Sequence, residues 1–158
     1  MKTLVLGIGN DILGDDGVGI SIAREVARRI SIADVAVEET GAAGLSILEL
    51  IRGYDRLIIA DAILMEGNEV GKIHRLTLKD LAKTNDSITL HDAALRATLE
   101  IGNSLFPGEI PTDVVVYCVQ TLDTQNVTDE MTRAVKVSVS RIVHLIISEI
   151  EGKNTNRS

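Results

Sequence analysis

The sequence predicts a single α/β domain: a mostly parallel, twisted sheet of about five strands with helices on both faces. Short apolar runs at residues 3–8, 35–39 and 57–60 are typical of buried parallel strands. Between them, residues 18–30 carry a one-sided apolar stripe typical of a helix, and residues 45–51 form a shorter helical segment. Two strand-helix-strand units imply right-handed crossovers and a parallel sheet.

The second half of the chain continues the pattern. We expect a strand, a helix, a strand and a helix at residues 71–76, 89–103, 113–119 and 129–150. The first strand of this set is placed at a sheet edge, and Thr89 with Asp92 resembles a capping box at the start of the first helix. With 158 residues, the chain suits one domain, assigned to residues 1–151. Residues 152–158 are expected to form a polar, disordered tail.

Composition excludes several classes of partner. The chain has 16 Lys plus Arg against 23 Asp plus Glu, a net charge of -7, and no basic run. Nucleic acid and anionic membrane surfaces are therefore not expected partners. No signal peptide or membrane-spanning run is apparent, so we expect a cytoplasmic protein, and nothing in the sequence requires more than a monomer. The single cysteine, Cys118, excludes an internal disulfide and is expected to be an inert core residue.

The first loop, in KTLVLGIGNDILGDDGVG, is the first candidate site. Its layout of strand, glycine turn and helix start often binds phosphate, but Asp15 and Asp16 occupy the place where an anion would lie. The loop is therefore interpreted as facing a cation. One of the two aspartates could instead cap the helix that begins near Gly17.

Two further loops leave the same edge of the predicted sheet, where ligands of open α/β sheets bind. Asp61 follows the strand LIIA directly. His91 falls in the first turn of a predicted helix, where the helix dipole favours the neutral imidazole that a metal ligand requires. Two carboxylates and one imidazole suit a divalent transition metal with open positions, without distinguishing nickel from zinc. His74 and His144 are interpreted as structural.

A nucleotide-binding site is the alternative from the residues. In GIGNDIL, Ile12 stands where G-x-G-x-x-G has its third glycine, so the dinucleotide fingerprint is incomplete. Glu38 or Glu39 could still supply the acidic contact to a ribose. The chain contains neither a G-x-S-x-G elbow nor H-E-x-x-H.

Four segments in order carry a family resemblance: GIGNDILGDDGVG, ETGAAG, LIIADAI and SITLHD. Together they resemble the [NiFe]-hydrogenase maturation endopeptidases, over residues 2–99. The resemblance implies an α/β fold with helices on both sides of the sheet. It also implies removal of a C-terminal extension from the hydrogenase large-subunit precursor once nickel has been inserted. The partner is then that precursor.

The resemblance also assigns residues. The metal-contacting acids fall on Asp16 and Asp61 and the histidine on His91, and these three are also the candidate catalytic residues, with roles left undivided. Nickel would come with the substrate, and zinc or cadmium could replace it in vitro. Substrate recognition falls on the second loop, Thr40, Gly41, Ala42, Ala43 and Gly44. This loop, ETGAAG, departs from the D-G-G-T-A-G form of some members. A nucleotide-binding regulatory domain and a non-catalytic nickel chaperone remain the alternatives.

Overall fold

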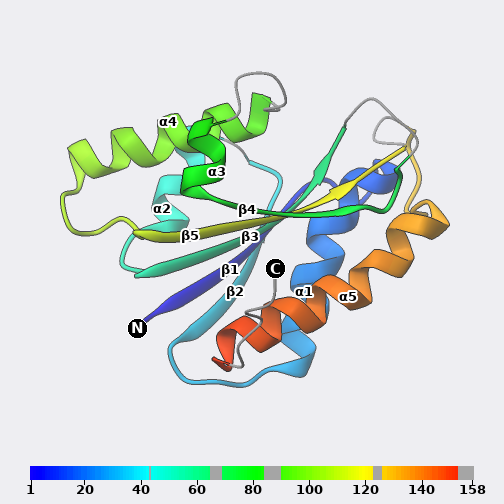
Figure 1. The fold of residues 1–158 in the computed structure, drawn as a ribbon, viewed down its shortest axis with the longest axis horizontal. Helices are drawn as coiled ribbons and strands as arrows, with labels where there is room; N and C mark the ends of the chain where they lie inside the picture. Colours follow the sequence, from blue (N-terminus) through cyan, green and yellow to red (C-terminus); the bar gives the residue numbers. More distant parts are fainter. Residues whose placement is uncertain (43, 65–68, 84–89, 123–125, 153–158) are drawn as a thin grey trace.

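The computed structural model describes the chain except residues 43, 65–68, 84–89, 123–125 and 153–158, and it leaves out the side chains of 82, 83 and 90–93. The expected disordered tail therefore lies almost wholly outside the described residues. Five strands form one sheet in the order β2-β1-β3-β5-β4 (Figure 1). The strands are β1 (Thr3–Ile8), β2 (Val35–Thr40), β3 (Arg56–Ile63), β4 (Ile73–Thr77) and β5 (Asp113–Gln120).

Four of the strands are parallel, and the fifth closes one edge. In register, Thr3 of β1 lies beside Val35 of β2 and Arg56 of β3, and Arg56 lies beside Asp113 of β5. Strand β4 pairs with β5 in the antiparallel direction. The predicted mostly parallel five-stranded sheet is therefore confirmed, as is the edge position of the strand expected near residues 71–76.

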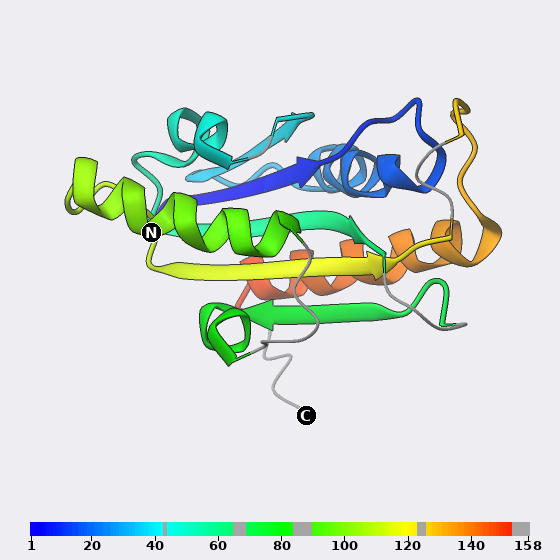
Figure 2. The same cartoon turned by 90° about the horizontal axis from the view of Figure 1, so that it is seen from above.

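Helices cover both faces of the sheet, as predicted (Figures 1 and 2). The helical elements are η1 (Gly14–Gly17), α1 (Val18–Arg29), η2 (Gly44–Ile47), α2 (Leu48–Ile51), α3 (Leu78–Lys83), α4 (Leu90–Leu105) and α5 (Arg133–Ile150). Helices α1 and α5 pack on one face, and α2, α3 and α4 pack on the other. The short helix α3 is an addition to the predicted elements.

Helix α5 begins later than its apolar pattern suggested. The predicted start was residue 129, but the first helical residue is Arg133. Thr132 has extended backbone angles, φ -52° and ψ 140°, and its N–H donates to the carboxylate of Asp15. That long-range contact holds Thr132 outside the helix, so the helix starts at Arg133, four residues after the predicted start.

The core is largely aliphatic on both faces of the sheet, with the buried Tyr117 as an aromatic member. Leu6, Ile59 and Leu99 lie in the layer under α4, and Ile22 and Ile142 lie in the layer under α1 and α5. The described residues contain no helix both long and apolar enough to cross a bilayer.

Candidate functional site

Glycines allow the start of α1 to pack against the carboxyl ends of two strands. A Cβ on Gly19 would collide with the carbonyl oxygens of Ile8 and Ala60. Ile8 is the last residue of β1, and Ala60 lies just past the middle of β3. Gly9 has a φ of +153°, and a Cβ there would collide with the carbonyl oxygen of Asp16. Side chains at these two positions would push η1 away from the sheet edge. The glycines therefore place Asp15 and Asp16 directly at that edge.

The two adjacent aspartates point to different partners. The Oδ2 atom of Asp16, which is partly exposed, accepts a hydrogen bond of 3.0 Å from the backbone N–H of Asn10. Asp15 is fully buried. Its carboxylate accepts the N–H of Leu122 at 3.0 Å, and the N–H and hydroxyl of Thr132 at 2.6 and 2.7 Å.

The helix-cap interpretation of these aspartates is therefore wrong. Neither η1 nor α1 has a side-chain cap, and the residue before α1 is Gly17. Asp15 instead ties the first loop to the segment between β5 and α5, more than one hundred residues further along the chain. This leaves Asp16 as the member of the pair that reaches the surface.

Asp61 lies inside β3, two residues before its end, whereas the sequence placed it immediately after the strand. It is 7% exposed, and its Oδ1 accepts the N–H of Ala62 at 2.8 Å. The side chains of Ile59 and Ile63 lie in the core under α4, so alternation places Asp61 on that same face. Asp61 therefore lies near the carboxyl end of β3 and on the face of the sheet that α4 covers.

His91 is the second residue of α4, in the first turn as predicted. Its side chain lies outside the described residues, as does Thr89 of the expected capping box. Helix α4 runs back along the sheet opposite to β5, so its first turn is directed toward the carboxyl ends of the parallel strands (Figure 2). Among the described side chains, no three His, Cys, Asp or Glu residues form a metal-binding group. The proposed ligand set of Asp16, Asp61 and His91 therefore stays a prediction.

The second loop joins the first through the backbone. The N–H of Gly9 donates to the carbonyl of Thr40 at 3.0 Å, and the hydroxyl of Thr40 accepts the N–H of Ala42 at 3.0 Å. Gly44 has a φ of +66° and opens η2, while Ala43 lies outside the described residues. A surface hollow of about 240 Å³ separates the two loops. It is lined by Gly9, Asn10, Asp11, Ile20, Arg24, Glu39, Thr40 and Gly41.

This arrangement counts against nucleotide binding. The carboxylate of Glu39 accepts two hydrogen bonds from the guanidinium of Arg24, at 2.8 and 2.9 Å, and Arg24 keeps the pKa of Glu39 below its usual range. The Glu39 carboxylate that would have to bind a ribose hydroxyl is therefore already occupied by Arg24. In the loop itself, the N–H of Asn10 binds Asp16 and that of Gly14 binds the carbonyl of Thr128, so neither donor is left for a phosphate.

One residue set aside by the sequence interpretation lies near the site. Across the sheet, Asp61 is level with Cys118 of β5, and Cys118 is level with His74 of β4. The three residues therefore share one row and one face. The Nε2 atom of His74 is buried and makes no hydrogen bond with the described residues. In the sequence, the alternation of His74 with the apolar Leu76 was the available sign that His74 lies on the same face as Leu76. Only the strand register shows that this row includes Asp61.

Comparison with known proteins relates most of the chain to one family. A family model described as hydrogenase maturation protease matches residues 20–149, which include Asp61 and His91 but not the first loop. The hydrogenase 2 maturation protease of Escherichia coli K12 is 34% identical over 113 residues, covering 70% of this chain and 68% of that protein. The HupD protein of Bradyrhizobium diazoefficiens is 27% identical over 147 residues, covering 91% and 75%.

Solved structures agree with these matches. The hydrogenase maturating endopeptidase HybD from E. coli aligns with a TM-score of 0.81 and 26% identity, over 98% of this chain and 94% of that one. The maturation protease HycI from Thermococcus kodakarensis aligns with a TM-score of 0.75, at 22% identity and coverage of 95% and 92%, and supports the fold. Fold and matches together define an α/β endopeptidase. The chain belongs to the hydrogenase maturation protease family.

Proposed function

We propose that this endopeptidase removes the C-terminal extension of a [NiFe]-hydrogenase large-subunit precursor after nickel insertion, with the nickel in the substrate serving as the recognition element. The observation that carries the proposal is the placement of Asp16 and Asp61. Glycine contacts hold one at the end of β1, and strand register holds the other in the adjacent β3. Carboxylate oxygen and imidazole nitrogen are suitable ligands for a divalent transition metal. His91, in the first turn of α4, is the proposed third ligand.

The hydrolysis needs a water molecule and a polarised peptide carbonyl. Attack by the water oxygen on the carbonyl carbon breaks the C–N bond, leaving a carboxylate on the mature subunit and an amine on the released tail. Nickel held by the three side chains would fix the scissile peptide against the site and withdraw charge from its carbonyl. We propose that Thr40–Gly44, whose backbone borders the hollow beside the first loop, contacts the precursor chain. We further propose that the enzyme acts as a cytoplasmic monomer.

The decisive experiment compares nickel-loaded and nickel-free precursor as substrates of the purified protein. Mass spectrometry of the large subunit should show a shortened C-terminus only for the loaded form. Equal cleavage of both forms would contradict nickel recognition while leaving the protease assignment intact. Nickel binding without cleavage of either form would instead favour the non-catalytic chaperone.

A further inference from the structure

Four strongly exposed aliphatic side chains border the candidate site. Ile12, Leu64, Leu122 and Val127 are 55%, 56%, 67% and 81% exposed, and we call them the apolar rim. They come from the three segments that leave the carboxyl ends of β1, β3 and β5. Single exposed aliphatic residues are ordinary on protein surfaces, so the significance of these four depends on their being neighbours.

Backbone hydrogen bonds bring Ile12 and Val127 together. The N–H of Thr128 donates to the carbonyl of Ile12 at 2.9 Å, and the N–H of Gly14 donates to the carbonyl of Thr128 at 2.9 Å. The loop after β1 and the segment before α5 consequently lie side by side at one end of the molecule (Figure 2). Ile12 and Val127 therefore lie on neighbouring segments although they are far apart in sequence.

A second pair of bonds brings Leu64 and Leu122 together. The N–H and the hydroxyl of Thr121 both donate to the carbonyl of Ile63, at 2.9 and 3.1 Å. Leu64 follows Ile63 and Leu122 follows Thr121, so the two leucines come next along these two segments. Asp15 joins this pair to the first, because it precedes Asp16 in the first loop and its carboxylate accepts the N–H of Leu122. The segments that carry the apolar rim are thus joined to one another and to the loop that carries Asp16.

We propose that the apolar rim is the docking surface for an apolar region of the large-subunit precursor, surrounding the point where its nickel meets Asp16. This inference rests on the proposed function. A folded protein that brings a bound metal to Asp16 must lie over the loops that carry the rim. Burying aliphatic surface there favours association, while the metal supplies the positive charge that the aspartates attract.

Charge favours the precursor over a second copy of this chain as the occupant. Each copy carries a net charge of -7, and self-association through this edge would bring two sets of acidic loops together. A nickel-bearing precursor instead combines apolar contact with an opposite charge at the centre.

The test is a pair of matched double variants. Leu122→Ser with Val127→Ser removes the most exposed half of the rim. Leu105→Ser with Val137→Ser removes aliphatic side chains of similar exposure, 61% and 62%, from the last turn of α4 and the surface of α5. Initial rates of cleavage are measured against the concentration of nickel-loaded precursor, and thermal unfolding is recorded for each protein.

The rim variant should show a KM about tenfold higher with little change in kcat, since tenfold corresponds to about 1.4 kcal/mol of contact energy. The control variant should stay within about twofold of the wild type. A rim variant with wild-type KM would overturn the inference while the proposed function stands. If the rim variant unfolds below the assay temperature, Val127→Ser alone replaces it and the same criterion applies.

Two other outcomes would also overturn the docking inference. If sedimentation shows that the wild type self-associates and the rim variant does not, the rim is a surface between copies of this chain. If the wild type and the control variant both fail to bind or cleave the loaded precursor, the proposed function fails first and the docking inference falls with it.

Discussion

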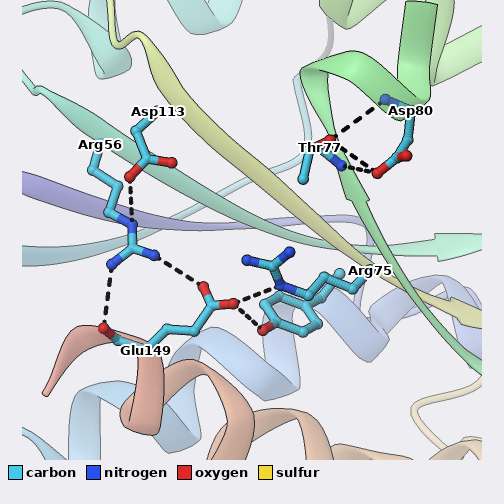
Figure 3. Close-up of polar contacts among 7 residues, drawn as sticks. Arg56, Arg75, Thr77, Asp80, Asp113 and Glu149 are labelled. Atoms are coloured by element: carbon cyan, nitrogen blue, oxygen red, sulfur yellow. Dashed lines mark hydrogen bonds and ion pairs between the residues drawn. The ribbon is translucent and has the colours of Figure 1, made fainter. Parts of the chain in front are cut away.

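Two regions of this molecule bury carboxylates, and they do so with different partners. On the α1 and α5 face, Glu149 accepts hydrogen bonds from Arg75 at 2.6 Å, from the Tyr117 hydroxyl at 2.7 Å and from Arg56 at 3.1 Å (Figure 3). At the carboxyl edge, Asp15 accepts hydrogen bonds from two backbone N–H groups and one hydroxyl.

This difference distinguishes the structural carboxylate of Glu149 from the carboxylates beside the candidate site. Two guanidinium groups neutralise Glu149, and Arg56 also pairs with Asp113 at 3.2 Å, so the charges of this cluster are balanced within the protein. Neutral donors orient a carboxylate without cancelling its formal charge. Within the described residues, Asp16 makes no ion pair, and its contact with Asn10 is of this neutral kind. We therefore expect this edge to favour the approach of the metal in the proposed substrate.

The largest expected effect tests the carboxyl edge. Asp16→Asn removes the charge but keeps the volume, and cleavage of nickel-loaded precursor should fall by at least about 100-fold. That figure follows because residues that merely support a metal ligand already contribute about 10- to 100-fold. Asp55→Asn, at an exposed aspartate before β3 and so at the opposite end of the sheet, is the control and should retain activity. An active Asp16→Asn enzyme would remove Asp16 from the ligand set.

The next effect tests the Glu149 cluster. Glu149→Gln leaves two guanidinium groups facing a neutral amide, and the free energy of unfolding should fall by about 3 kcal/mol. Urea unfolding followed by circular dichroism measures the change. Cleavage per folded molecule should be unchanged, since the cluster is not at the carboxyl edge. In Glu25→Gln, the exposed pairs with Arg28 and Arg29 are lost and little destabilisation is expected. Lost activity in folded Glu149→Gln protein would contradict the separation of the two regions.

A smaller effect is expected where the two distant loops are joined. Thr132→Val removes the hydroxyl that donates to Asp15 while keeping the side-chain shape and the backbone N–H. Unfolding free energy should fall by about 1 kcal/mol, the typical contribution of one hydrogen bond. Cleavage should also weaken, because the loop that carries Asp16 is held less firmly. Thr128→Val, which loses only a bond to the N–H of Glu130 in an exposed turn, should change stability by less than about 0.5 kcal/mol.

The smallest effect appears only in alkali. Burial, followed by the hydrogen bond to Glu149, raises the pKa of Tyr117 above its ordinary 10.0. The unfolded chain therefore loses this proton at lower pH than the folded chain does. The stabilisation is fully present below pH 10 and is lost as pH rises toward the folded pKa. Urea unfolding from pH 9 to 12 should show a steeper decline for the wild type than for Tyr117→Phe, and equal slopes would contradict the assignment.

Local sequence predicted the parallel strands and located the carboxyl edge of the sheet. The glycine and aspartate pattern identified the first loop, and the apolar run before Asp61 brought the second acid to the same edge. The exact place of Asp61 was not predictable, because β3 extends to Ile63 through pairing with β5 up to Gln120. The length of β3 depends on its neighbour β5, about sixty residues further along the chain, and the residues of the run LIIA do not indicate that pairing.

The fold class, the order of the elements apart from α3 and the position of the acidic loop were predictable from the sequence alone, because periodicity and turn chemistry act over a few residues. Only the tertiary structure decided which partner each buried carboxylate has. Asp15, one of the two aspartates that could have capped α1, instead binds Leu122 and Thr132, and the position of Glu149 in a predicted helix did not indicate its partners Arg56 and Arg75. These partners are set by how the sheet and helices pack, which a local pattern does not contain.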